Sequence, residues 1–320
     1  MQSENKPIFI VGSPRSGTSL LTWCLGQHPN VLPLPETHWI ARLSVHMRQL
    51  YRFGSINGRY SHLGALDWTE KDFYAELGRT IDQFIVNTRE PRLQFIRKLS
   101  RKECGFSDEK IREMEKKGNL SPDPVLVSAK NYQVIRSSSD PKRRWVDGTP
   151  ENTFYMYSLS TLFPEAVFIH LLRNPSDVAR SLMNFSQAGG AGLDHREAEA
   201  FLKWQKGVEY AVKGEQALGK EKVLRINYEE LVADSEKTLR KCFNFLGEEF
   251  NSDCLLPIQQ KVNSSKVGNS PSQFKLSTSE GKVANDFYQK IYYKLPGASD
   301  AKIFSELVDH YEKYADQINV

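Results

Sequence analysis

Residues 8–19 read Ile-Phe-Ile-Val-Gly-Ser-Pro-Arg-Ser-Gly-Thr-Ser, and this stretch decides the class of fold. The apolar, mostly β-branched run Ile8–Val11 is typical of a buried parallel strand. Gly12 and Gly17 then bracket a short loop, and the apolar stripe within 20–25 opens a helix. A strand, a glycine-bracketed loop and a helix build an anion site from backbone N–H groups and the positive end of the helix dipole.

The loop differs from that of the nucleoside triphosphatases at one decisive position. It matches the frame Gly-x-x-x-x-Gly, but Thr18 stands where those loops carry a lysine. The positive charge lies inside the loop instead, at Arg15. Because a loop without that lysine is poorly suited to holding β- and γ-phosphates, the sequence favours a donor other than ATP.

The composition sets broad limits on function. The 320 residues are 39% hydrophobic and 26% charged, which is ordinary for an enzyme with one large α/β domain or two smaller ones. The 43 basic and 39 acidic residues give a formal net charge of +4. That small, dispersed excess suits a small anionic ligand and argues against a nucleic-acid partner.

The cysteines and the start of the chain indicate a reducing compartment. Residues 1–6 lack the apolar core of a signal peptide, and no run approaches the ~20 apolar residues of a membrane span. The cysteines are scattered, without a CxxC pair or a histidine at zinc spacing, so we expect free thiols and no metal site. They are Cys24, Cys104, Cys242 and Cys254. We therefore expect a cytoplasmic protein with no membrane span.

Strands and helices alternate after the first motif. A C-terminal helix is expected to carry an apolar face with Ile303, Leu307, Tyr311 and Tyr314. The other expected elements are strands over 167–172 and 223–226 and helices over 149–163, from 174, over 195–217 and over 235–246, with Thr149 as an N-cap. This alternation predicts a three-layer α/β fold, in which a central parallel sheet with helices on both faces carries a P-loop-like nucleotide site.

Two segments interrupt the alternation. Residues from about 40 to 120 have the pattern of helices with a charged face, which predicts a helical insertion that shapes an acceptor pocket. Residues from about 255 to 298 are rich in Ser, Asn, Gly and Lys, which predicts an irregular lid. The chain has no internal repeat, and we expect residues 1–320 to form a single domain.

Two separated motifs resemble those of sulfotransferases that use 3′-phosphoadenosine 5′-phosphosulfate (PAPS). The first is the loop described above, and the second is Leu-Leu-Arg-Asn-Pro-Ser-Asp-Val-Ala-Arg-Ser-Leu at 171–182. In that family the loop holds the 5′-phosphosulfate, while an arginine closing a central strand and a serine eight residues later hold the 3′-phosphate. The resemblance thus implies donor-binding roles for Arg15, Ser16, Gly17, Thr18, Ser19, Arg173 and Ser181.

The chain is most similar to the bacterial and tyrosylprotein-type branch of that family. In that branch His-Pro-(Asp/Asn)-Val is followed by a glutamate, as His28-Pro29-Asn30-Val31 is followed here by Glu36. The segment Asn-Tyr-Glu-Glu-Leu at 227–231 also resembles the branch, whose tyrosine touches the nucleotide; here that residue is Tyr228. The resemblance covers 7–40 and 145–247.

Glu36 is the candidate general base. Sulfuryl transfer to an alcohol needs a proton removed from the attacking hydroxyl, and a carboxylate beside the loop can accept it. Arg15 is the second candidate catalytic residue, since its planar guanidinium can bridge phosphate and sulfuryl oxygens as charge moves onto the leaving phosphate. His38 is the alternative base, because other sulfotransferase branches use histidine.

The chain departs from the family pattern at two positions. Many relatives carry Lys-Thr/Ser-Pro where this chain reads Gly148-Thr149-Pro150, so either Arg15 acts alone or another lysine, such as Lys266 in the expected lid, takes that role. Some relatives also have an arginine where this chain has Phe185. Three tryptophans are candidates for stacking on adenine or acceptor, although at least two of them are expected to be packing residues. They are Trp39, Trp145 and Trp204.

The sequence leaves alternatives open. A nucleoside or sugar kinase shares the loop frame, but it needs the loop lysine and an acidic residue at the end of the 167–172 strand to hold magnesium. A catalytically inactive nucleotide-binding protein is the other alternative, and the presence of both Arg15 and Glu36 argues against it. The acceptor hydroxyl can belong to a carbohydrate, a lipid, a small metabolite or a peptide tyrosine. The sequence leaves the oligomeric state open.

Overall fold

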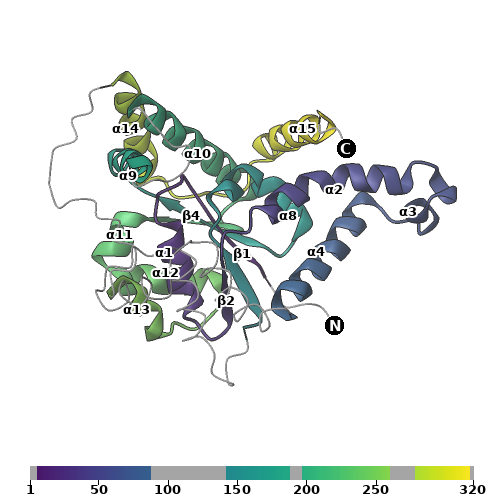
Figure 1. Ribbon diagram of the computed structural model, residues 1–320, viewed down its shortest axis with the longest axis horizontal. Helices are drawn as coiled ribbons and strands as arrows, with labels where there is room; N and C mark the ends of the chain where they lie inside the picture. Colours follow the sequence, from purple (N-terminus) through teal and green to yellow (C-terminus); the bar gives the residue numbers. More distant parts are fainter. Residues whose placement is uncertain (1–5, 88–141, 188–196, 260–277, 318–320) are drawn as a thin grey trace, which may run out of the picture.

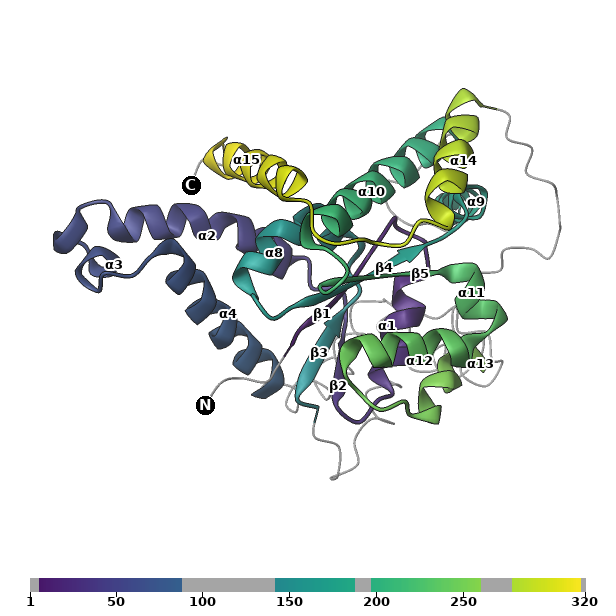
Figure 2. The ribbon, with the colours of Figure 1, turned by 180° about the vertical axis from the view of Figure 1, so that it is seen from behind.

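The computed structural model describes residues 6–87, 142–187, 197–259 and 278–317. Their strands form one five-stranded parallel sheet in the order β2-β3-β1-β4-β5 (Figures 1 and 2). The strands are β1 (Ile8–Val11), β2 (Val31–Leu34), β3 (Arg144–Asp147), β4 (Val167–Leu172) and β5 (Val223–Asn227). Because every neighbouring pair is parallel, all carboxyl ends lie at one edge of the sheet.

Helices cover both faces of the sheet, as the alternating pattern predicts (Figure 1). The longer helices are α1 (Thr18–Gly26), α2 (Trp39–Ser55), α4 (Glu70–Asn87), α9 (Pro175–Gln187), α10 (Glu197–Leu218), α12 (Ser235–Leu246), α14 (Ser279–Tyr292) and α15 (Ala301–Gln317). The shorter ones are η1 (Gly58–Tyr60), α3 (His62–Ala65), η2 (Pro150–Tyr155), α8 (Met156–Leu162), α11 (Tyr228–Ala233), η3 (Ser252–Leu255) and α13 (Leu256–Gln259).

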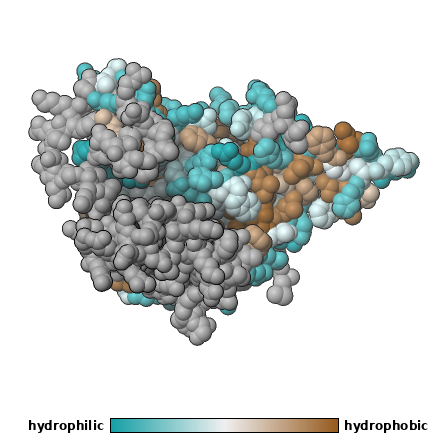
Figure 3. Space-filling model, in the orientation of Figure 1, coloured by the Kyte–Doolittle hydropathy of each residue, from teal (hydrophilic) through white to brown (hydrophobic). Residues whose placement is uncertain are grey.

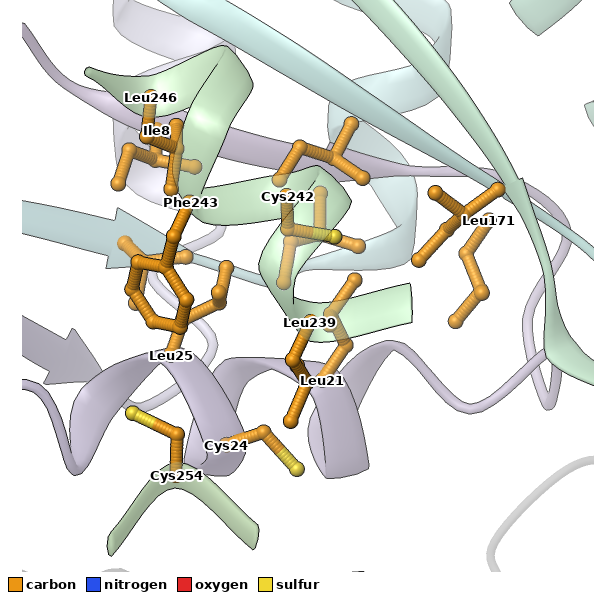
Figure 4. Packing of buried hydrophobic residues seen from close by; sticks show 14 of the residues in the cluster. Ile8, Leu21, Cys24, Leu25, Leu171, Leu239, Cys242, Phe243, Leu246 and Cys254 are labelled. Carbon is orange, nitrogen blue, oxygen red and sulfur yellow. The ribbon is translucent and has the colours of Figure 1, made fainter. Parts of the chain in front are cut away.

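The central strand β1 shows how the core divides into two layers. Ile8 and Ile10 pack with α1 and α12, whereas Phe9 and Val11 pack with residues of α2, α4 and α8. This alternation follows from the two-residue period of a strand, and it explains why the whole of β1 is apolar. Figure 4 shows the first of these layers, in which side chains of α1 and α12 meet those of the strands.

The cysteines of the described segments are free, as predicted. All three are buried: Cys242 lies on α12 near the strands, whereas Cys24 of α1 and Cys254 of η3 lie where η3 packs against α1 (Figure 4). Burial raises the pKa of the Cys242 and Cys254 thiols to about 12. These three cysteines are therefore packing residues, while Cys104 lies outside the described residues.

The first helical hairpin projects from the sheet as an arm. It consists of α2, η1, α3 and α4, so the helical prediction for about 40–120 is confirmed as far as Asn87 (Figure 1). The rest of that predicted insertion lies outside the described residues. Arg48 ties the arm to α15 through Glu312 and Asp316, at 3.1 and 3.4 Å. Apolar side chains, among them exposed residues of 50–66, gather on the arm (Figure 3).

Two strands were harder to predict from the sequence than the others. The segment 31–34 forms β2, although it contains Pro33, which cannot donate a hydrogen bond within a sheet. The strand β3 was not predicted, because its four residues begin and end with the charged residues Arg144 and Asp147. Arg144 is nevertheless buried, donating to the Leu246 carbonyl at 2.8 Å and to Glu248 at 3.1 Å.

The prediction of an irregular lid over about 255–298 is wrong for two of its parts. Residues 256–259 form α13 and residues 279–292 form α14. The side chain of Thr278 caps α14 by accepting from Gly281 N, and Ala284, Tyr288 and Ile291 pack beside α9 and α10. The polar outer face of this amphipathic helix dominates its composition and hides the helical signal. Residues 260–277 lie outside the described segments.

The predicted helix starts are confirmed in position, with one correction. The α9 helix begins at Pro175, where Asn174 Oδ1 accepts from Ser176 N at 2.9 Å. The expected helix over 149–163 begins as the 3₁₀ helix η2, and the Thr149 side chain does not cap it. On the apolar face predicted for α15, Tyr311 is buried, while Tyr314 is 46% exposed. Within the described ranges, no helix is long and apolar enough to cross a membrane.

Candidate functional site

The loop between β1 and α1 adopts a conformation that only glycine accommodates at its two ends. Gly12 and Gly17 have φ values of 141° and 101°. A Cβ at Gly12 would lie 2.6 Å from the Leu171 carbonyl oxygen, and one at Gly17 would lie 2.6 Å from the Tyr228 ring. Thr153 fixes the start of the loop, because its hydroxyl accepts from Gly12 N at 2.8 Å and donates to Gly12 O at 2.9 Å.

The first turn of α1 presents donors at the carboxyl edge of the sheet. The helix begins at Thr18, so its first backbone N–H groups have no acceptor within the helix. Ser16 and Thr18 are buried beside them, and Ser16 Oγ is fully buried without a hydrogen-bond partner among the described residues. Such a cluster of buried donors has the chemistry of an anion site, which is the role that the sequence analysis expects here.

The two predicted arginines meet at this loop. Arg173 directly follows β4, and its Nη1 donates to the Arg15 carbonyl at 2.9 Å. Its guanidinium lies 4.1 Å from the centre of the Tyr228 ring, and its own carbonyl accepts from Trp204 Nε1 at 3.0 Å. Arg173 Nε is buried and has no partner within the described part of the chain. Arg173 is thus held by contacts with the Arg15 carbonyl, the Tyr228 ring and the Trp204 indole, and its Nε is a buried donor that a ligand can use.

Arg15 joins the loop to α9. Its Nε donates to Ser181 Oγ at 3.1 Å, so the structure brings together residues that are 166 positions apart. Burial lowers the pKa of Arg15, the charge of Arg173 lowers it further, and Glu36 opposes both effects. Two like charges held this close favour an anion between or beside them.

Glu36 lies two residues beyond β2 and faces the same edge of the sheet. Its side chain is half-exposed, and its Oε2 is 3.3 Å from His38 Nε2. Burial raises the pKa of Glu36, and Asp147 also raises it, whereas His38 and Arg15 lower it. The predicted general base and the alternative base are therefore neighbours, within the electrostatic reach of the loop arginine.

A buried hydrogen-bond network holds the segment that carries Glu36, and the sequence analysis missed it. Asp147, at the end of β3, is fully buried. It accepts from the Thr37 hydroxyl at 2.7 Å, the Thr149 N–H at 2.9 Å, the Thr149 hydroxyl at 2.5 Å and the Asn152 amide at 3.0 Å. Thr149 Oγ1 in turn accepts from Thr37 N at 2.8 Å. The sequence feature that could have indicated this network is an aspartate two residues before Thr149-Pro150.

The position of the missing family lysine is filled by packing. A Cβ at Gly148 would lie 2.1 Å from Thr22 Oγ1 and 3.2 Å from the Thr18 carbonyl oxygen. A side chain at 148 therefore requires the Thr22 side chain or α1 itself to shift. Lys266 lies outside the described residues, and of Phe185 only its place in α9 is described.

The three candidate tryptophans have different surroundings. Trp145 is buried and donates to Asp82 Oδ1 at 2.8 Å, so it is a core residue. Trp204 of α10 is buried and supports the Arg173 carbonyl. Trp39 is 44% exposed at the start of α2, next to Glu36 and His38 along the chain. Gly207 of α10 also approaches the loop, since its Cβ would lie 3.1 Å from Ser13 Cα.

The site contains no acidic residue directly after β4, where a kinase needs one, because Arg173 occupies that position. Among residues that the structure describes, no group of three or more His, Cys, Asp or Glu side chains is arranged to hold a metal ion.

The parallel sheet, the glycine-bracketed loop and the helix that follows it define a P-loop-like nucleotide-binding protein. The family model described as "Sulfotransferase family" matches residues 7–252. The chain therefore belongs to the sulfotransferase family, which confirms the resemblance carried by the two motifs.

Curated relatives support this assignment at low identity. Nodulation protein NoeE of Sinorhizobium fredii is 28% identical over 174 residues, which are 54% of this chain and 30% of that protein. Protein-tyrosine sulfotransferase 2 of Gallus gallus is 24% identical over 249 residues, which are 78% of this chain and 53% of that protein. The chain thus spans about half or less of the length of these relatives.

Solved structures of sulfotransferases are also similar to this chain. A sulfotransferase domain from the curacin biosynthetic pathway aligns with a TM-score of 0.45 at 18% identity, covering 96% of this chain and 98% of that one. A sulfotransferase domain from the Synechococcus PCC 7002 olefin synthase aligns with a TM-score of 0.45 at 20% identity, covering 99% and 98%.

Proposed function

We propose that this sulfotransferase moves the sulfuryl group of PAPS to a hydroxyl acceptor and releases adenosine 3′,5′-bisphosphate. The observation that supports this proposal most directly is the convergence of Arg15, Arg173 and Ser181 on the loop beside Glu36. It combines two cations for an anionic donor with one carboxylate for an acceptor proton.

The donor assignment is supported by the buried groups that the chain leaves available. Ser16 Oγ and Arg173 Nε are buried donors without partners in the described segments, so both are available to a bound anion. Residues 15–19 would hold the 5′-phosphosulfate, while Arg173 and Ser181 would hold the 3′-phosphate. Tyr228 packs under the Arg173 guanidinium and would contact the nucleotide.

The transfer chemistry follows from the charges around Arg15. As the bond between sulfur and the phosphate oxygen breaks, negative charge develops on the leaving phosphate, and the Arg15 guanidinium stabilises it. The acceptor oxygen attacks sulfur in line with that bond, and Glu36 takes its proton. Arg15, backbone N–H groups and hydroxyls supply the positive charge without a metal ion.

The acceptor belongs to the proposal only as a hydroxyl group. One relative is a protein-tyrosine sulfotransferase by name, so a peptide tyrosine is one candidate acceptor. A carbohydrate, a lipid and a small metabolite are the others. The half-exposed position of Glu36 leaves room for any of these at the edge of the sheet.

Nucleotide-dependent thermal shifts test the donor. Adenosine 3′,5′-bisphosphate should stabilise the fold by ~2.7 kcal/mol at a hundredfold excess over its dissociation constant. ATP with magnesium should stabilise it much less, because it lacks a 3′-phosphate for Arg173 and Ser181. Equal shifts with both nucleotides would favour the kinase. A selective shift without transfer of radiolabelled sulfate to any cell-extract fraction would favour an inactive binding protein.

A further inference from the structure

His38 bridges two carboxylates with its two ring nitrogens. Its Nε2 lies 3.3 Å from Glu36 Oε2, and its Nδ1 lies 3.2 Å from Glu151 Oε2. A neutral imidazole has one N–H, so both nitrogens donate only when the ring carries an extra proton. The arrangement therefore fits a proton shared along the line Glu36, His38 and Glu151, with the imidazole in the centre.

The backbone holds this arrangement in place. His38 has φ 48° and ψ −40°, a conformation that non-glycine residues seldom adopt. The preceding residue, Thr37, is fixed by Thr149 and Asp147, and α2 begins at the following residue, Trp39. The His38 side chain is 55% exposed, and ion pairs between exposed groups are weak. The network around Thr37, rather than the ion pairs, thus directs the ring.

We propose that His38 is a positioning residue that relays the acceptor proton away from Glu36. The proposal depends on the proposed role of Glu36 as general base. In the transfer step, the acceptor O–H bond breaks, its electron pair forms the bond to sulfur, and its proton passes to Glu36. The ring starts as the neutral Nδ1–H tautomer, so Nε2 can accept the proton from Glu36, and the proton on Nδ1 then passes to Glu151 and on to water. Proton exchange of the exposed ring with water restores the Nδ1–H tautomer. The relay returns Glu36 to its ionised form without any other reactant.

The charged groups around the relay set its dependence on pH. Glu36 faces His38, Arg15 and Asp147. Glu151 faces His38 and Arg42 of α2, and Arg42 Nη2 lies 3.3 Å from Glu151 Oε1. The charge of Glu151 also contributes to the raised pKa of Tyr155. His38 lowers the pKa of Glu36 against the raising effects of burial and Asp147. Removing the imidazole should therefore raise the pKa of Glu36. Glu36 then becomes protonated at a higher pH, so the acid limb of the pH–rate profile, where activity falls with decreasing pH, moves to higher pH.

Single-turnover transfer from bound PAPS, measured against pH, tests the relay. His38→Asn is the best variant, because asparagine tolerates positive φ but cannot bridge both carboxylates. We expect the rate to fall about tenfold, less than the ~10²–10⁴-fold loss expected for Glu36→Gln. The acid limb should move to higher pH, and the affinity for adenosine 3′,5′-bisphosphate should stay unchanged. Glu151→Gln removes the carboxylate that receives the Nδ1 proton, so it should also slow the rate, by less than His38→Asn does.

The controls separate the relay from the general base. His62→Asn changes an exposed histidine of α3 and should leave both rate and profile unchanged. If the loss of activity at low pH is not shifted in His38→Asn, the relay is wrong, whatever the rate of that variant. If His38→Asn does not fold, an unchanged single-turnover rate in Glu151→Gln would overturn the relay instead. If Glu36→Gln itself retains its rate, the proposed base is wrong. A slow Glu36→Gln enzyme with a normal His38→Asn enzyme rejects the relay alone.

Discussion

At the scale of single residues, the two arginines of the site have different surroundings and should have different roles. Arg173 lies over Tyr228 with its backbone carbonyl held by Trp204, which suits a fixed contact to bound nucleotide. Arg15 has positive φ in the loop and lies under the opposing influence of Arg173 and Glu36. We therefore expect the interactions of Arg15 to change more than those of Arg173 when charge moves during the proposed transfer.

Alanine substitutions separate these roles. Arg173→Ala should weaken binding of adenosine 3′,5′-bisphosphate by ~1.5–3 kcal/mol, the usual contribution of hydrogen bonds to a charged group. Arg15→Ala should mainly slow the turnover of bound donor, because its bonds strengthen in the transition state. Calorimetric titration and single-turnover rates measure the two effects, with the exposed Arg240→Ala as control. The same profile in both variants would contradict the division.

Asp147 is buried and raises the pKa of Glu36, the proposed general base. The Asp147 carboxylate accepts four hydrogen bonds, whereas the amide of Asp147→Asn has an NH₂ group that would face some of the same donors. The substitution should therefore destabilise the fold by roughly 2–3 kcal/mol. Because the Asp147 charge raises the pKa of Glu36, its removal lowers that pKa, and activity should persist to lower pH. Chemical denaturation and the pH–rate profile measure both effects. A shift of the acid limb to higher pH would show that Asp147 does not act on Glu36 in this way.

At the scale of elements, local sequence predicts the donor site better than it predicts the acceptor side. The strand, loop and helix over 8–26 lie in one continuous segment, so their pattern is visible directly. The network of Thr37, Asp147 and Thr149 forms only because β2 and β3 are neighbours in the sheet. The bridge through His38 depends on a positive φ that a propensity argument does not anticipate.

The contact between α1 and the end of β3 explains why this chain has glycine at 148. Gly148→Lys should destabilise the fold by ~1–3 kcal/mol, because its Cβ collides with Thr22 Oγ1. Thr22→Ala removes that oxygen, so the double variant should be more stable than the sum of the single effects predicts, by at least ~0.5 kcal/mol. Urea denaturation of the cycle measures this coupling. Additive effects would mean that something other than Thr22 keeps a side chain out of position 148.

At the scale of the whole molecule, one parallel sheet places every proposed group at a single edge. The loop follows β1, Glu36 follows β2, Asp147 ends β3 and Arg173 follows β4. Four strand ends thus contribute the proposed anion site, the proposed base Glu36, the aspartate whose network holds the Glu36 segment, and a second arginine. Residues that are distant in sequence meet there because the carboxyl ends of parallel strands share one edge. That arrangement is the physical basis of the proposed transfer reaction.

The measurement that tests this account most directly is transfer of radiolabelled sulfate from PAPS by Glu36→Gln, with a cell-extract fraction as acceptor. Glutamine keeps the size of the side chain but cannot accept a proton, so turnover should fall ~10²–10⁴-fold. The affinity for adenosine 3′,5′-bisphosphate should stay unchanged, and the exposed Glu236→Gln should behave as the unmodified enzyme. A Glu36→Gln enzyme that keeps more than about a third of the turnover would contradict the central claim that this carboxylate removes the acceptor proton.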